Sequence, residues 1–123
     1  MADSLILAAA VLAGLWCFVH LIMGGREVAQ PLLAAASLDP MVRHVQYICW
    51  HFTSVTIALM ATFFALAYVT GVAAYAVCGL LLSTGFVVVG IGLVVKLGLS
   101  HSKHPQGWLF VPVALLGLGG VLL

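Results

Sequence analysis

Residues 39–71 read DPMVRHVQYICWHFTSVTIALMATFFALAYVTG, and this stretch decides the fold class. Asp39 is a good N-cap residue and Pro40 suits the first helical turn, so a helix is predicted to begin here. The second half of the stretch carries no charged residue before Gly71. An apolar segment of this length satisfies its backbone in lipid as a helix, which predicts a transmembrane helix over 40–69. At ~1.5 Å per residue that helix is ~45 Å long, so its first turns should project beyond the ~30 Å apolar layer.

Composition extends this expectation to the whole chain of 123 residues, which is 65% hydrophobic and 6% charged. Soluble domains are about half apolar and about a quarter charged, so an ordinary soluble domain is excluded. Three further apolar segments cover residues 4–23, 72–97 and 106–123. We therefore predict an all-α integral membrane protein, a single domain over 1–123 with four antiparallel transmembrane helices in one bundle.

The loops predict the orientation of this bundle in the bilayer. Gly24-Gly25 is expected to stop the first helix, and residues 24–39 should then lie along the membrane interface. All four basic residues fall on the side where the first helix ends and the second begins. They are Arg26, Arg43, Lys96 and Lys103. The positive-inside rule puts that side in the cytoplasm and both termini outside, as in a multi-pass protein of a bacterial inner membrane. Four basic residues leave no footprint for nucleic-acid binding.

All histidines of the chain are expected at this same face of the membrane. They are His20, His44, His51, His101 and His104. His20 and His51 fall at the mouth of the hydrocarbon layer on two adjoining helices. An ionisable group at that depth is read by default as functional and as facing the bundle interior. The loop histidines need no function, because water reaches them.

A histidine cluster of this kind favours a bound cofactor, either haem b or a transition metal. For haem, one axial histidine from each of two facing helices is required, which His20 and His51 could supply. His44, Arg43 and Tyr47 lie on the protruding turns of the same helix and are further candidate cofactor-binding residues.

A transition-metal site would need histidines from several helices. His44 and His51 are seven residues and ~10.5 Å apart on one helix, which is too far for one small ion. The candidate metal ligands are therefore His20, His51 and His104. Glu27 is a fourth candidate, as a ligand or as a partner that orients a histidine, and it could equally form an ion pair with an arginine.

Two other functions remain open on the sequence. The chain could be an accessory or oligomer-forming subunit that packs its glycine-bearing helix faces against copies of itself or a larger membrane complex, with no cofactor of its own. It could also be a quinone- or lipid-binding module whose pocket is lined by Tyr47, Trp50 and His51. In every case the lipid bilayer is the expected surrounding.

Overall fold

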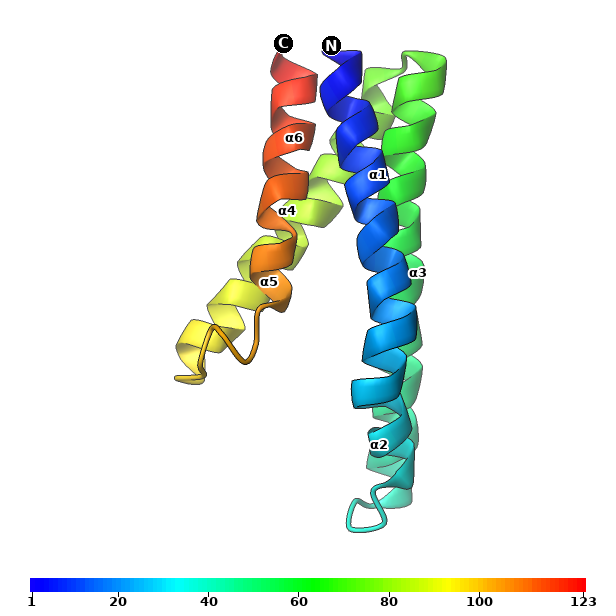
Figure 1. The fold of residues 1–123 in the computed structure, drawn as a ribbon, viewed down its shortest axis with the longest axis vertical. Coiled ribbons are helices and arrows are strands. Elements are labelled where there is room, and N and C mark those ends of the chain that lie inside the picture. The colour runs from blue at the N-terminus through cyan, green and yellow to red at the C-terminus, as the bar shows by residue number, and fades with distance from the viewer.

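The computed structural model describes residues 1–123 and is helical throughout, with no strands (Figure 1). Three helices are long and apolar enough to cross a membrane, and their bounds are Asp3–Ala34, Pro40–Thr70 and Ala73–Lys96. A shorter apolar helix covers Gln106–Leu122. The chain is therefore an all-helical protein whose helices are suited to integration in a membrane. Its successive elements are α1 (Asp3–Val19), η1 (His20–Ala29), α2 (Gln30–Ala34), α3 (Pro40–Thr70), α4 (Ala73–Lys96), α5 (Gln106–Leu109) and α6 (Val111–Leu122).

The first helix does not stop at Gly24-Gly25, and that expectation from the sequence was wrong. The helix continues through η1, a π-helical segment, into α2. A π-helix has hydrogen bonds between residues five apart, and here the Gln30 N–H donates to the Gly25 carbonyl. Neither glycine of the pair has the positive φ of a helix-ending residue; only Gly71 and Gly98 do.

Helix α3 begins and ends with local signals that are legible in the sequence. The Asp39 side chain accepts hydrogen bonds from the main-chain N–H groups of Met41 and Val42, at 2.9 and 3.4 Å. At the other end Gly71 adopts φ 70°, a left-handed conformation that suits glycine at a helix C-cap. The turn between α3 and α4 is consequently very short.

The last apolar segment, expected as one helix over 106–123, forms an apolar helix over Gln106–Leu122 with an irregularity at Phe110, between α5 and α6. Pro112 lies in the first turn of α6. Proline has no N–H and its ring crowds the carbonyl of the fourth residue before it, so an uninterrupted α-helix through this position is disfavoured.

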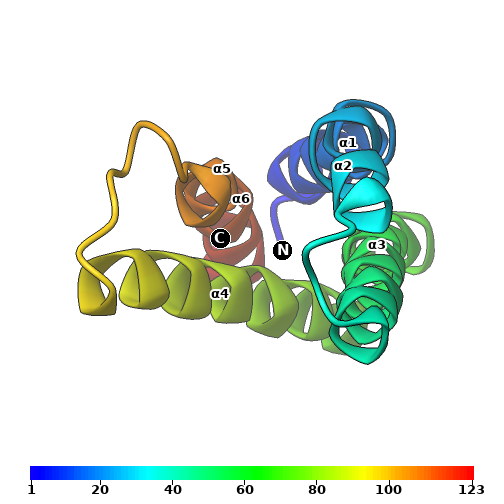
Figure 2. The same ribbon diagram turned by 90° about the horizontal axis from the view of Figure 1, so that it is seen from below.

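The helices form a packed end and an open end. The first helix lies alongside α3, and both termini lie together at one end of the molecule (Figure 1). Helix α4 leaves α3 at a steep angle and carries α5 away with it, as the view from below shows (Figure 2). The core lies near the termini, where α1, α3, α4 and α6 meet. Its fully buried members include Ile6, Ala9, Ala13, Met60, Phe64, Ala67, Ala76 and Val113.

Phe64 is the centre of this core. It is fully buried and belongs to the middle of the α3 face that packs on its neighbours. Methyl groups added to Gly79 and Gly117 would come within 2.9 and 2.7 Å of its ring. Small residues in α4 and α6 thus make room for one large aromatic side chain, which is how membrane helices gain close packing without a hydrophobic driving force.

Candidate ligand-binding site

His20 and Trp50 lie against each other between the first helix and α3. Their ring centroids are 4.4 Å apart and their planes differ by 18°, a stacked arrangement. His20 Nε2–H donates a long hydrogen bond of 3.4 Å to the main-chain carbonyl of Trp50. The same carbonyl accepts from the hydroxyl of Ser54 at 3.2 Å. One face of the His20 imidazole is therefore covered by the indole ring.

Tyr47 and His51 extend this cluster along α3. The ring of His51 stands edge-on to Trp50 at 5.0 Å and to Tyr47 at 4.6 Å. Positions 47, 50 and 51 share one face of a helix, since residues three and four apart are neighbours on its surface. These contacts make a continuous aromatic wall on α3.

The glycine pair of η1 faces this wall. A methyl group added to Gly24 would lie 3.8 Å from both Trp50 Cζ2 and His20 Nδ1. One added to Gly25 would lie 3.9 Å from Trp50 Cη2. The glycine pair therefore lies next to the indole ring, and a methyl group at either position would make an ordinary van der Waals contact with it. π-Helical segments are frequent at functional sites, and η1 is therefore a candidate part of such a site.

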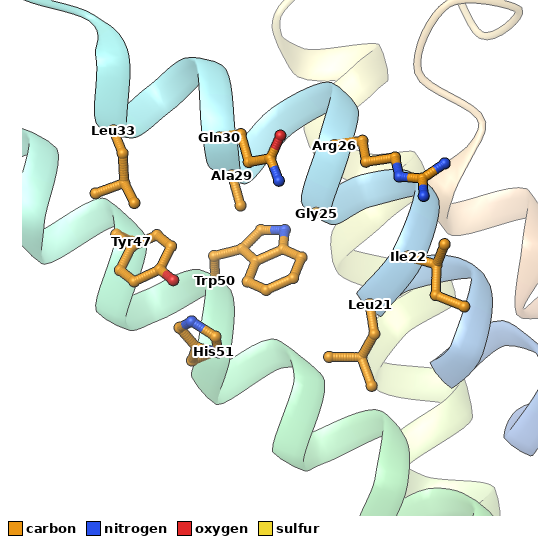
Figure 3. Close-up of a pocket in the computed structure, with 10 residues that line it drawn as sticks. All are labelled: Leu21, Ile22, Gly25, Arg26, Ala29, Gln30, Leu33, Tyr47, Trp50 and His51. Carbon is orange, nitrogen blue, oxygen red and sulfur yellow. The ribbon is translucent and has the colours of Figure 1, made fainter.

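A cavity of about 350 Å³ lies between the two helices at this point (Figure 3). Figure 3 shows Tyr47, Trp50 and His51 on α3 opposite Ala29 and Gln30 on the first helix. The lining residues are Leu21, Ile22, Gly25, Arg26, Ala29, Gln30, Leu33, Tyr47, Trp50 and His51. The volume falls within the range of small-molecule sites in proteins, about 300–1,000 Å³.

The lining combines an apolar surface with a few hydrogen-bond donors. Arg26, Gln30, Tyr47 and His51 all carry N–H or O–H groups, while no carboxylate lines the cavity. One face of the Trp50 indole is stacked on His20, which leaves the opposite face for a flat ligand. The cavity is thus suited to a flat ligand that carries hydrogen-bond acceptors and no cationic group.

Comparison with known protein families, curated proteins and solved structures finds no match to this chain. Function is therefore inferred from the residues of the site.

Only Tyr47, Trp50 and His51, three of the 10 lining residues, were predicted from the sequence to line a pocket. Arg26, Gln30 and Ala29 fell in a stretch expected to be a loop. The signal was nonetheless present, because positions 22, 26, 29 and 33 recur at intervals of three and four residues, the spacing of one helix face. This periodicity was not recognised as helical because the first helix was expected to end at Gly24-Gly25.

Four of the predicted site residues lie near the cavity but do not line it: His20, His44, Glu27 and Arg43. His44 is exposed on the second turn of α3, and Glu27 is exposed on η1. Arg43 is half-buried, and its Nη1 donates to the main-chain carbonyl of Ala35 over 3.5 Å. Arg43 therefore holds the turn between α2 and α3 in place. Its buried Nε has no hydrogen-bond partner.

The two remaining histidines lie in the loop between α4 and α5. His101 Nδ1 accepts a hydrogen bond of 2.9 Å from the indole N–H of Trp108, and His104 Nδ1 lies 3.1 Å from the Ser100 carbonyl. Because α4 diverges from α3, this loop is carried away from the end of the molecule that holds η1 and α2 (Figures 1 and 2). The structure brings His20 and His51 together but not His104. It contains no group of three or more His, Cys, Asp or Glu side chains arranged to hold a metal ion.

Proposed function

We propose that this protein binds a membrane quinone, with the ring in the cavity between η1 and α3 and the isoprenoid tail in the apolar layer. The observation that carries the proposal is the composition of the cavity lining. His51, Tyr47, Gln30 and Arg26 are donors for the two carbonyl oxygens of a quinone, and Trp50 offers its ring face. Leu21 and Ile22, at the end of the cavity away from α2, provide the apolar surface for the first part of the tail (Figure 3).

The donor set favours a quinone over a phospholipid headgroup at this cavity. A phosphate is best held by several cations or bidentate arginines, and Arg26 is the only cation in the lining. A quinone is neutral, and ordinary N–H and O–H donors match its carbonyl groups. The aromatic wall also favours a flat ring over a branched headgroup.

Haem b or a transition metal, expected from the histidines, is a less favoured occupant. Axial ligation between His20 and His51 requires that each imidazole has a free ring nitrogen pointing at the iron. The indole of Trp50 stacks on His20, whose Nε2 is directed at the Trp50 carbonyl. Association with itself or with a larger membrane complex stays a prediction from the sequence.

The proposed setting is a bundle of four antiparallel membrane-spanning helices in a bacterial inner membrane, with both termini outside the cytoplasm. The fourth span would be α5 with α6, an apolar helix over Gln106–Leu122 that is ~26 Å long at 1.5 Å per residue. The position of both termini at one end of the molecule supports an even number of crossings (Figure 1).

Cysteine labelling tests this topology. In a background without the native Cys17, Cys49 and Cys78, single cysteines are placed at positions 26, 43, 72 and 103. A membrane-impermeant maleimide added to intact spheroplasts is expected to label only position 72, and the other three should react only after the membrane is opened. Labelling of position 103 together with 72 in intact spheroplasts would contradict four crossings.

Fluorescence quenching tests quinone binding. Quinones quench tryptophan at short range, and Trp50 lines the cavity whereas Trp108 is 50% exposed in a different part of the molecule. Two variants each keep one reporter, Trp50 or Trp108, with phenylalanine at the other tryptophan positions. Titration with decylubiquinone at fixed detergent is expected to quench Trp50 saturably at one ligand per chain, and Trp108 only weakly and linearly. Equal linear quenching of both would mean mere partitioning into the micelle, and the proposal would fail.

A further inference from the structure

A second cavity, of about 440 Å³, lies where α4 separates from α3. Near the short turn the two helices are in contact, with Gly79 of α4 against Phe64 of α3. Further along they diverge, and α5 packs on α4 instead of α3 (Figure 2). The groove left between them is lined by Thr53, Leu81, Leu82, Gly85, Phe86, Val89, Gly90, Gln106 and Gly107.

In the wall of this groove, α4 and α5 are closely packed on each other. A methyl group added to Gly90 would meet the Cα of Gly107 at 2.7 Å, so the two backbones are in direct contact. Phe86 packs on Phe110 with ring centroids 4.7 Å apart. These contacts keep α5 against α4 and leave the space toward α3 open.

The lining offers almost nothing to a polar ligand. The hydroxyl of Thr53 already donates to the Cys49 carbonyl of its own helix at 3.2 Å. Gln106 is the other polar side chain, and it lies at the end where α5 begins. The middle of the groove is therefore suited to a methylene chain.

Positively charged side chains near the Gln106 end of the groove favour a lipid with an anionic headgroup. Helix α4 ends at Lys96, and Lys103 stands three residues before Gln106 of the groove. Both lysines are exposed. The whole segment 71–123 contains no Asp or Glu to neutralise them. A lipid with its chain in the groove would bring its headgroup to this uncompensated positive charge.

We propose that the groove between α3 and α4 binds an anionic glycerophospholipid, with one acyl chain along Gly85 and Val89 and the phosphate facing Lys96 and Lys103. This lipid site is separate from the proposed quinone cavity and shares no lining residue with it. The bound chain fills the wedge that the divergence of α4 leaves open.

Native mass spectrometry tests the proposal on the full-length protein, released from nanodiscs that contain equal amounts of phosphatidylglycerol and phosphatidylcholine. The wild type is expected to retain one phosphatidylglycerol. Gly85→Phe fills the groove without a clash, because nothing lies within 4 Å of a methyl group there, and should lower that occupancy at least fivefold. Gly92→Phe is the matched control, since it also points into open space on α4 but lies outside the groove. The double variant Lys96→Gln, Lys103→Gln should remove the preference for the anionic lipid.

Three results would overturn the proposal. The first is equal retention of both lipids by the wild type, and the second is unchanged retention of phosphatidylglycerol by Gly85→Phe. The third is a wild-type dimer that the Gly85→Phe substitution converts to a monomer, because the groove would then be a protein interface. Helical content by circular dichroism is checked for each variant. If Gly85→Phe loses it, Val89→Trp in the same groove takes its place.

Discussion

Gly25→Leu is expected to weaken quinone binding by at least tenfold, about 1.4 kcal/mol or more. A methyl group at Gly25 would meet only Trp50 Cη2, at 3.9 Å, so a leucine side chain fits without displacing the backbone and extends into the cavity that Gly25 lines. The ring of the quinone and the leucine would compete for one volume. The measurement is the decylubiquinone titration followed through Trp50.

The control for this experiment is Gly92→Leu, which makes the same change in open space on α4, away from the cavity. It should bind decylubiquinone like the wild type. Thermal unfolding of both variants in detergent checks that they are folded. If Gly25→Leu bound the quinone with wild-type affinity, the ligand would not lie between η1 and α3, even if saturable quenching were observed.

Gly117→Leu is expected to destabilise the protein by about 1–3 kcal/mol, the usual cost of overpacking a core. The reason is the position of Phe64, whose ring lies within 2.9 Å of a methyl group added at Gly79 and within 2.7 Å of one at Gly117. A ring contacted from both sides cannot move away from one helix without meeting the other. The new side chain must therefore push α6 away from α3.

Stability is measured by unfolding the protein with SDS in mixed micelles. The mole fraction of SDS at the unfolding midpoint should be lower for Gly117→Leu than for the wild type. Gly92→Leu serves as the comparison, because nothing lies within 4 Å of a methyl group at that position and it lies outside the groove. An unchanged midpoint for Gly117→Leu would show that Phe64 is not held between α4 and α6. Phe64→Ala should relieve the clash, so the double variant should be less destabilised than the sum of the two single changes.

Local chemistry explains the elements that sequence reasoning placed correctly. The Asp39 cap and the turn at Gly71 depend on residues within a few positions of each other, and the structure contains both. The apolar character of the long helices follows from composition alone, because lipid leaves the backbone few other ways to satisfy its hydrogen bonds. The proximity of His20 and His51 was also predictable, since both fall at one end of adjoining helices.

The packing of distant residues decided the rest. Gly24-Gly25 is a helix stop by local rules, yet here both glycines are helical and lie next to Trp50 of another helix, and the chain stays helical as far as Ala34. That extension turned a predicted loop into one wall of a cavity. The angle at which α4 leaves α3 is likewise invisible in the sequence, although it separates His104 from His51 and opens the second groove. By itself the sequence determined the apolar helical segments, the two ends of α3 and where polar groups lie along the chain. Only the tertiary structure decided which of those groups meet, because helix crossing angles depend on contacts between side chains that are far apart in the chain.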